Sequence, residues 1–559
     1  EPVRPLSVLA LSPALLVLLL AGLVLRLLIA YVLFPGSGFE SDLASYAAWA
    51  STMAEHGPAG FYANAGFADY PPAYLYVLWL AGLAAEAGDD IGELIKLPPI
   101  LLDIAVGYVI YRLVRGWTWP GARSQALALG AAALYLFNPV SFYDSALWGQ
   151  TDAAGALILL LGLAALIRGN SEGAAALAAT AALVKPQFGV VLIPLVAAVL
   201  LKRHLLQVGS GPHRRPWAPA GLARWLAREQ GPLRLLTAFA AAWVAFFVIA
   251  LPFGMGPLEY LERMFGTAGG YGYLSVNAFN LWALVAPEGA SSLAAGLAWN
   301  DDTVPLLGPI PGVALGATLL VAGFLWGLWR AAVRDDRWTL IVAVTFLAVA
   351  FFILPTRVHE RYLFPAIALM PLLAAVRRRW GLALVLLSVG AFINFHGILT
   401  LPLYGSENVE TLPLGELFRT EPWIILSALL QTGVGLWVAW QLRPGLATSP
   451  DGFDREAAAG KAAAAATLVA PHVQAYPDAG APPPVPPPAA YPAAAPPLPL
   501  TAQVRGFVDG LVARLSWGSL RRDRSAVLAS EPGGRIDRVD LLVVVVLIVL
   551  TLFLRGFRL

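Results

Sequence analysis

The sequence predicts an all-α polytopic membrane protein, a bundle of about 11–13 transmembrane helices with a large first outer loop that carries amphipathic helices. Of the 559 residues, 58% are hydrophobic and only 13% are charged. Soluble domains are about 45–50% apolar and about 25% charged. Apolar runs recur from end to end, among them 15–29, 340–354 and 541–554. The chain has no cysteine, which excludes disulfides and thiolate metal sites.

The apolar runs place the predicted spans along the whole chain. They lie at about 8–33, 97–114, 124–138, 151–168, 173–184, 188–201, 235–252, 312–330, 338–355, 363–376, 380–398, 423–441 and 541–554. A helix needs about 20 apolar residues to cross the hydrocarbon. The runs 173–184 and 188–201 are shorter and flank Lys185-Pro186, so we expect them to be tilted or buried against other helices.

Charge in the short loops predicts the orientation. Basic residues concentrate in 202–234, 330–337 and 377–379, whereas 34–70 contains four acids and no Lys or Arg. Since basic loops face the cytoplasm, the outer face should carry 34–96, 139–150, 185–187, 253–311, 356–362 and 399–422. This map requires the apolar run 71–84 to be a re-entrant or interfacial helix. If 71–84 crosses instead, Asp69 and Asp144 lie on opposite sides.

The chain divides by composition into a transmembrane module, 1–445, and three further segments. Residues 446–500 form a Pro/Ala-rich linker, with twelve prolines in 471–500, and such a stretch cannot build a packed core. We expect it to be disordered and cytoplasmic. A basic juxtamembrane segment, 501–540, precedes a last transmembrane helix in 541–559. That helix is either a tail anchor or the start of a truncated second module, because LFLRGFRL echoes LVLRLLIA in the first span.

The first outer loop carries two candidate acids. In GFESDLASYAAW, the residues Asp42, Tyr46 and Trp49 are spaced to share one face of a short amphipathic helix. Two prolines follow Tyr70, so Asp69 should be presented at a rigid bend. A capping or solvated acid is the alternative for Asp42. The absence of any base across 34–70 favours a functional role.

The second outer loop combines aromatic, amide and carboxylate groups, which suit a sugar ring. Its candidates are Asp144, Trp148 and Gln150, with Asp152 close behind. The alternative is an aromatic belt at the membrane interface followed by a helix N-cap at Thr151 or Asp152. Asp103 lies within a predicted span, where we expect it to pair with Lys96 or an inner polar group.

Two short motifs place cations at the outer boundary of the membrane. These are LVKPQFG, with Lys185 and Gln187, and PTRVHERYLFP, with Arg357, His359, Glu360 and Arg361. Charges beside hydrocarbon are costly and usually functional. Guanidinium groups bind phosphate oxygens bidentately, so a lipid-borne phosphate is the expected ligand. The alternative is a snorkelling interfacial cluster.

The segment 253–311 contains GGYGYLSVNAFNLWAL, with Asn277 and Asn280. A Gly-rich loop of this kind is either a lid over a site or a plain connection.

Taken together, these motifs resemble the GT-C superfamily of membrane glycosyltransferases, which use polyprenyl- or dolichyl-phosphate sugars. SDLASYAAW stands where that superfamily carries its catalytic acid. VHERYLF is similar to a motif of the glucosyltransferases that use dolichyl-phosphate-glucose. DYPPAYLY, WGQTD and VKPQ are similar to bacterial relatives of the second GPI mannosyltransferase, and DRVDLL with the last span is similar to the opening of protein O-mannosyltransferase modules. The resemblance covers roughly 1–445.

The resemblance implies inverting transfer of a hexose, with mannose favoured, from a polyprenyl-phosphate sugar to an acceptor hydroxyl at the non-cytoplasmic face. Asp42 would be the general base, and Asp69 would orient it or bind the acceptor. Arg361, with His359 and either Lys185 or Arg357, would stabilise the leaving phosphate. The sugar or acceptor contacts would come from Tyr70, Asp144, Trp148, Gln150, Gln187, Asn277, Asn280 and Glu360.

The expected partners are the isoprenoid-phosphate donor, the bilayer, and a lipid-linked glycan, protein or cell-wall polymer as acceptor, with no nucleic acid. No cofactor or divalent metal is expected, because Glu40-Ser41-Asp42 is not an Asp-x-Asp pair. The composition favours a bacterial plasma membrane with the site on the extracytoplasmic side. The alternatives are a glycan ligase or oligosaccharyltransferase that uses a diphosphate lipid, and a secondary transporter.

Overall fold

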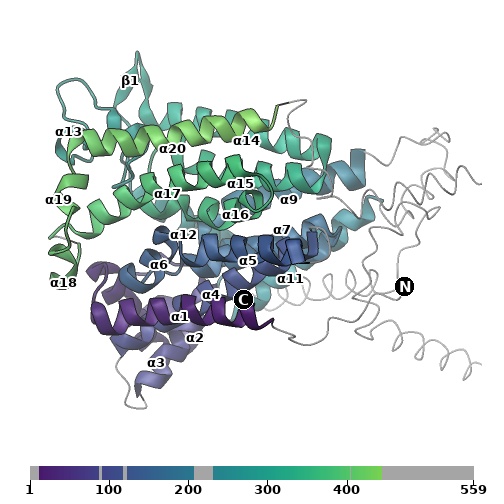
Figure 1. The fold of residues 1–559 in the computed structure, drawn as a ribbon, viewed down its shortest axis with the longest axis horizontal. Coiled ribbons are helices and arrows are strands. Elements are labelled where there is room, and N and C mark those ends of the chain that lie inside the picture. Colours follow the sequence, from purple (N-terminus) through teal and green to yellow (C-terminus); the bar gives the residue numbers. More distant parts are fainter. Residues whose placement is uncertain (1–11, 87–90, 118–121, 207–230, 403, 444–559) are drawn as a thin grey trace, which may run out of the picture. The chain divides into compact units, whose positions relative to one another are not determined.

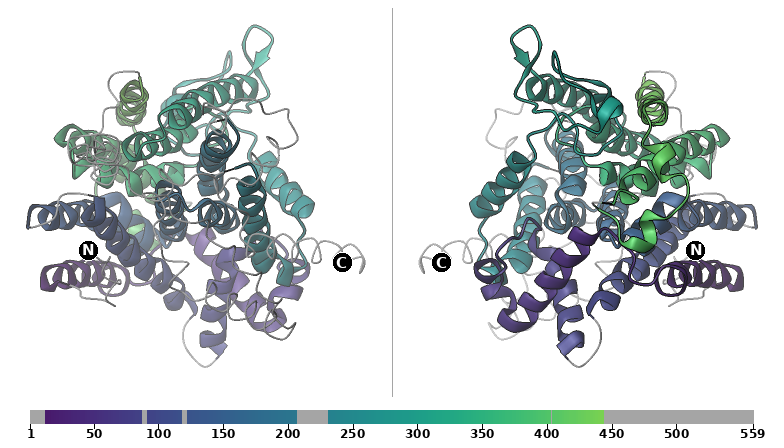
Figure 2. Two further views of the ribbon diagram at one scale, coloured as in Figure 1. Left: turned by 90° about the vertical axis from the view of Figure 1, so that its right-hand side faces the viewer. Right: turned by 90° about the vertical axis from the view of Figure 1, so that its left-hand side faces the viewer.

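The computed structural model describes residues 12–86, 91–117, 122–206, 231–402 and 404–443, which belong to one structural unit. The linker predicted at 446–500, the basic segment 501–540 and the last helix in 541–559 lie outside the described residues. Figure 1 shows the long helices of the described part running side by side, and Figure 2 looks roughly along them.

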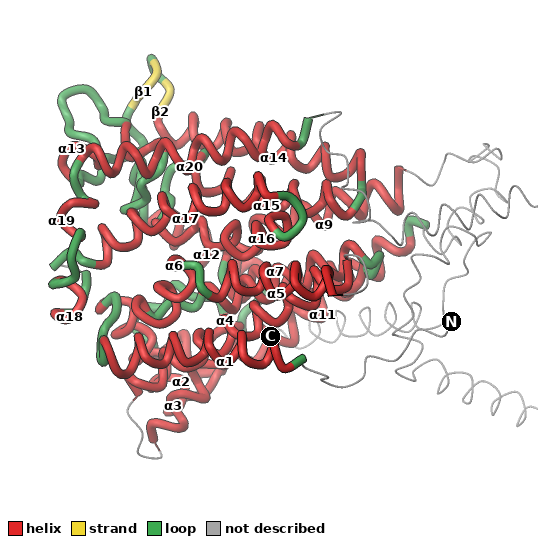
Figure 3. Tube along the Cα trace, viewed as in Figure 1, coloured by secondary structure: helices red, strands yellow, loops and turns green. Residues whose placement is uncertain are grey.

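The described residues are mostly helical, so the predicted all-α polytopic fold class is confirmed. Figure 3 shows one small strand pair among the helices and loops, the antiparallel β1 (Pro305–Leu307) and β2 (Ile310–Pro311). The helices of the first half are α1 (Pro13–Leu27), η1 (Leu28–Leu33), α2 (Glu40–Asn64), α3 (Pro72–Glu86), α4 (Ile91–Trp117), α5 (Ala122–Leu136), α6 (Pro139–Phe142), η2 (Tyr143–Trp148), α7 (Asp152–Ile167), α8 (Ser171–Val184), α9 (Pro186–Leu201) and η3 (Lys202–Leu206). Those of the second half are α11 (Leu233–Ala250), η5 (Leu251–Phe253), α12 (Pro257–Gly270), η6 (Leu281–Leu284), α13 (Leu293–Gly296), α14 (Gly312–Arg334), α15 (Arg337–Ile353), η7 (Glu360–Leu363), α16 (Phe364–Ala374), α17 (Arg378–Leu399), α18 (Glu407–Glu410), α19 (Gly415–Phe418) and α20 (Glu421–Gln441).

Seven described helices are long and apolar enough to cross a membrane. An eighth candidate is the pair Ser124–Leu136 and Pro139–Trp148, bent by 49° at the break before Pro139. The predicted span 188–201 is longer than expected, because η3 extends it to Leu206. In contrast, α7, α15 and α16 have 16, 17 and 11 residues, and most of their side chains are buried. Helices surrounded by protein need not match the thickness of the lipid, which explains why these three are short.

A buried ion pair ties the first helix to the bundle. Arg26 of α1 donates from Nε to Asp103 of α4 at 2.9 Å, and both side chains are fully buried. The Tyr135 hydroxyl donates to the other oxygen of Asp103. Asp103 therefore pairs with an inner arginine and not with Lys96, whose ammonium donates to the Ser37 hydroxyl at 3.0 Å. Pairing offsets the cost of burying each charge.

Loops that the sequence assigns to the outer face meet at one end of the helices. Phe39 donates its backbone N–H to the carbonyl of Trp148 at 3.2 Å and pairs with Gly405 in an isolated bridge. Val276 and His359 form a second bridge. Because the loops on either side of 97–138 share one end, an even number of crossings must separate them. This agrees with the predicted topology in which the run 71–84 does not cross the membrane. The helix that contains this run, α3, has 15 residues and is only about 22 Å long.

Candidate active site

Asp42 lies in the first turn of α2, with one carboxylate oxygen bound and the other open. Its Oδ2 accepts hydrogen bonds from Trp148 Nε1 at 3.1 Å, from Gln150 Nε2 and from Arg361 Nη1 at 2.7 Å. Its Oδ1 accepts none from the described residues, and the side chain is 24% exposed. Just before α2, Gly38 has φ 157° and leaves no room for a Cβ, which would collide with the Leu43 side chain and lie 3.0 Å from the Trp148 carbonyl oxygen. The carboxylate is thus oriented by three donors and keeps a free lone pair.

Arg361 presents a cation beside this carboxylate. Its guanidinium lies over the Trp148 ring, 5.2 Å from the centroid, and 5.9 Å from that of Phe39. The side chain is 12% exposed, and Nε is buried without a hydrogen-bond partner among the described residues. Burial opposes the charge, but Asp42 and Glu360 outweigh it and raise the pKa of Arg361. Nη1 also lies 3.4 Å from Glu360 Oε1, so the Nη2 amino group is the part of the guanidinium left for an anion.

A second cation is already neutralised by an acid. Lys185, between α8 and α9, donates to Asp152 at 2.7 Å and to Gln150 Oε1 at 3.0 Å. Gln187 donates to the other oxygen of Asp152 at 2.6 Å. Although burial lowers the pKa of the Lys185 ammonium, Asp152 more than offsets this and the pKa is raised. Thr151 is the N-cap of α7 but its side chain makes no capping bond, so the Asp152 carboxylate serves the ion pair instead.

Gln150 joins these two groups, because its amide donates to Asp42 while its carbonyl oxygen accepts from Lys185. Tyr46 also donates to Gln150 Oε1, at 3.0 Å, and its hydroxyl lies 2.7 Å from that of Tyr70. Tyr46 and Asp42 therefore share one face of α2, as their spacing predicts. The network runs without interruption from Arg361 to Lys185.

Asp69 and His359 lie beside the network and are not hydrogen-bonded into it. No other described side chain donates to the Asp69 carboxylate, and burial raises its pKa. The His359 ring meets Tyr271 edge-on, with centroids 4.6 Å apart. Burial, followed by the charges of Arg361 and Lys185, lowers the pKa of His359 to about 3. His359 is consequently neutral near pH 7 and can offer a phosphate only an N–H donor.

Arg357 is engaged elsewhere. Its guanidinium binds Asp302 bidentately, with Nε–Oδ2 at 2.7 Å and Nη2–Oδ1 at 2.9 Å. The same Asp302 carboxylate accepts from the Thr356 hydroxyl at 2.7 Å. Arg357 has φ 64°, and its backbone N–H donates to the carbonyl of Tyr273. This arrangement fastens the segment 271–302 against the chain that leads to Arg361.

Several other residues that the sequence suggested for the site are buried or bound within the protein. Trp148, Asp144 and Glu360 are 0%, 0% and 3% exposed, and neither carboxyl oxygen of Asp144 has a hydrogen-bond partner among the described residues. Asn277 accepts from Trp299 at 2.9 Å, while Asn280 donates to the carbonyl of Phe352 at 2.8 Å. Because they are buried or bound in this way, none of these five residues, Trp148, Asp144, Glu360, Asn277 and Asn280, lines the open side of the site.

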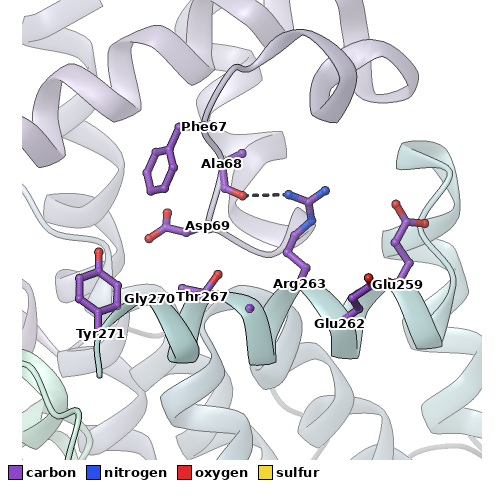
Figure 4. Close-up of a pocket in the computed structure, with 10 residues that line it drawn as sticks. Phe67, Ala68, Asp69, Glu259, Glu262, Arg263, Thr267, Gly270 and Tyr271 are labelled. Carbon is purple, nitrogen blue, oxygen red and sulfur yellow. Dashed lines mark hydrogen bonds between the residues drawn. The ribbon is translucent and has the colours of Figure 1, made fainter. Parts of the chain in front are cut away.

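A cavity of about 750 Å³ adjoins the network and was not anticipated from the sequence. It lies between the loop that carries Asp69 and one face of α12 (Figure 4). Tyr271, which also lines it, contacts the His359 ring. Its lining consists of Phe67, Ala68, Asp69, Glu259, Glu262, Arg263, Gly266, Thr267, Gly270 and Tyr271. The α12 members follow a helical spacing that was readable in the sequence. Among the described residues, no group of three or more His, Asp or Glu side chains is arranged to hold a metal ion.

Comparison with known proteins leaves the family open. A family model described as the GPI transamidase subunit PIG-U matches residues 52–285, less than half of the chain and a range that excludes both Asp42 and Arg361. No curated protein matches the sequence. A solved structure, ArnT from Cupriavidus metallidurans bound to undecaprenyl phosphate, is 17% identical over 81% of this chain and 80% of that chain, with a TM-score of 0.38. A likeness at that level does not bear on function.

Proposed function

We propose that this protein transfers a hexose, with mannose favoured, from a polyprenyl-phosphate sugar to an acceptor hydroxyl. The observation that carries the proposal is the Asp42 carboxylate, which has one oxygen fixed by Arg361, Gln150 and Trp148 and the other free. A general base needs a lone pair within hydrogen-bond reach of the proton that it takes. Held by three donors, Asp42 can offer Oδ1 in one orientation only.

The reaction that fits this arrangement is a single displacement. The acceptor hydroxyl would give its proton to Asp42 Oδ1 while its oxygen bonds to the anomeric carbon. The bond between that carbon and the phosphate oxygen would break, and the polyprenyl phosphate would leave with the electron pair. The unused N–H groups of Arg361 would bind the phosphate as its negative charge grows. Attack opposite the leaving group inverts the anomeric centre.

The same contacts assign roles to the neighbours. Lys185 is paired with Asp152, so it would position Gln150, and through it Asp42, instead of carrying the phosphate. Tyr70 would help to hold that amide from the other side. Glu360 and the ring of Trp148 would support Arg361 from within the protein. A single arginine with one free edge suits a monophosphate better than a diphosphate, which favours the transferase over the ligase.

A second candidate is a non-catalytic membrane subunit that binds a glycolipid. The match of residues 52–285 to the PIG-U model favours it. The two candidates differ in what they require of Asp42, because a binding subunit needs no base there.

The test is donor consumption by the full chain reconstituted in nanodiscs, with bacterial membrane lipids as the acceptor source. Labelled undecaprenyl-phosphate mannose and glucose should release undecaprenyl phosphate, whereas a diphosphate-linked oligosaccharide should not. Consumption of the diphosphate donor would establish the ligase. Binding of the donors without consumption of any would favour the subunit.

A further inference from the structure

The cavity beside Asp69 is lined by several polar groups. The carboxylates of Asp69, Glu259 and Glu262 and the hydroxyls of Thr267 and Tyr271 line it, and none of them hydrogen-bonds to another described side chain. Glu259 and Glu262 are exposed, whereas Asp69, Thr267 and Tyr271 are half-buried, and half-buried polar groups normally find partners within the protein. Several convergent unpaired groups in one concave space are characteristic of a ligand site.

Aromatic rings occupy one end of this cavity. Phe67 is 60% exposed, and Figure 4 shows its ring on the same side as Asp69 and Tyr271. The loop that carries Phe67 is held rigidly, because Trp49 Nε1 donates to the carbonyl of Phe67 at 2.7 Å and Arg263 donates to that of Ala68 at 3.0 Å. An aromatic face next to hydrogen-bonding groups matches the two faces of a sugar ring.

The other end of the cavity is an acidic helix face. Glu259, Glu262, Arg263, Gly266, Thr267 and Gly270 recur at the spacing of one face of α12. This face extends about 16 Å, which is room for more than one sugar ring. The guanidinium of Arg263 lies 4.1 Å from the centroid of the Tyr62 ring and donates to the loop. Three acids against one arginine make the lining net negative.

We infer that this cavity is the acceptor subsite and that it takes a neutral or amine-bearing oligosaccharide and disfavours a phosphorylated one. The inference rests on the proposed transfer, and it names the acceptor class. The aromatic end, which Tyr271 joins to the His359 segment, receives the reacting sugar. The acidic face of α12 binds the sugars behind it. Asp69 and Tyr271 line the cavity, and after the effect of burial the nearby charge of Asp42 also raises the pKa of both side chains. An acceptor in the cavity would therefore lie close to the Asp42 carboxylate.

Three glycines of α12 make a sharp test possible. Gly266 and Gly270 line the cavity, whereas Gly269 does not. A Cβ at any of the three meets no atom within 4 Å, and none of them has a positive φ. A side chain can therefore start from each of these positions without displacing the atoms around its Cβ. Gly266→Phe and Gly270→Phe fill the cavity, and Gly269→Phe is the matched control.

Binding is measured by saturation-transfer NMR on the full chain in detergent, without any donor. The probes are a neutral hexose trisaccharide, an amine-bearing counterpart and a phosphorylated counterpart. The first two should bind, Gly266→Phe and Gly270→Phe should abolish binding, and Gly269→Phe should preserve it. The phosphorylated probe should bind about fivefold more weakly, the effect of one like charge at 4 Å in a water-like dielectric. Glu259→Gln with Glu262→Gln should remove that difference.

These binding experiments test the acceptor subsite independently of the proposed transfer reaction. If no trisaccharide binds, or if all three Gly→Phe variants bind as the wild type does, the cavity is not the acceptor subsite. Tighter binding of the phosphorylated probe would overturn the charge preference. If the neutral probe binds as expected and no donor is consumed, the transferase proposal fails while the sugar site stands.

Discussion

Replacing Arg361 probes the junction between the carboxylate and the proposed phosphate site. One of its nitrogens, Nη1, holds Asp42 at 2.7 Å, and Nε is buried with no partner among the described residues. Arg361→Met removes the phosphate donors and one donor to the base. Loss of a preorganised transition-state donor costs about 2.7–4 kcal/mol, which corresponds to about 10²–10³ in kcat. Arg361→Lys keeps the charge, but one ammonium cannot reproduce the planar fork.

We therefore expect Arg361→Lys to recover only part of the loss, leaving kcat about tenfold or more below the wild type. The assay is single-turnover release of undecaprenyl phosphate at saturating donor, with size-exclusion elution as the check on folding. If Arg361→Lys turns over at the wild-type rate, the bidentate role is refuted. If Arg361→Met stays within threefold of the wild type, the phosphate role fails as well.

Three further predictions concern the surroundings of the site. Lys185→Met should destabilise the protein by about 3–5 kcal/mol, because it leaves Asp152 buried without its cation. Adding Asp152→Asn should restore most of the lost stability, as measured by thermal unfolding followed by size exclusion. A double variant that is no more stable than Lys185→Met would contradict this. The pKa of His359 is lowered from 6.5 to about 3, so between these pH values the unfolded chain binds a proton that the folded chain does not. The stability of the protein should therefore fall as the pH decreases through this window. The melting temperature of His359→Gln should fall less steeply over the same pH range, and parallel profiles of the variant and the wild type would argue against this. Arg357→Met and Asp302→Asn should slow turnover to similar, non-additive extents, since they break one bidentate pair; additive losses would show independent roles.

The sequence shows which residues carry charge, but it does not show which of them contact one another in the fold. Composition and the basic loops were sufficient to predict a helical membrane protein in which the loops assigned to one face meet at one end of the helices. The motif around Asp42 and the motif around Arg361 were both identifiable, yet neither motif predicted that these two side chains are in direct contact. They are 319 residues apart in sequence and 2.7 Å apart in the structure, a contact that no local pattern encodes.

Span lengths and pairing partners were harder to predict for a physical reason. A hydropathy pattern reports how apolar a segment is, but it does not distinguish lipid from protein as the surroundings. The helix α16 is surrounded by protein and has 11 residues where the sequence predicts a span over 363–376. Likewise, the inner arginine that pairs with Asp103 lies in the first span, 77 residues away. The spacing of the polar residues of α12 was readable in the sequence, but a helical spacing does not show that a cavity faces those residues.

The most direct test of the account is the Asp42→Asn variant in single turnover at saturating labelled undecaprenyl-phosphate mannose. Asparagine can still accept hydrogen bonds from Trp148 and Arg361 but cannot take the proton. The account predicts unchanged donor binding and a chemical step slowed by about 10²–10⁴, the usual contribution of a general base. Transfer at the wild-type rate by a folded Asp42→Asn protein would contradict it.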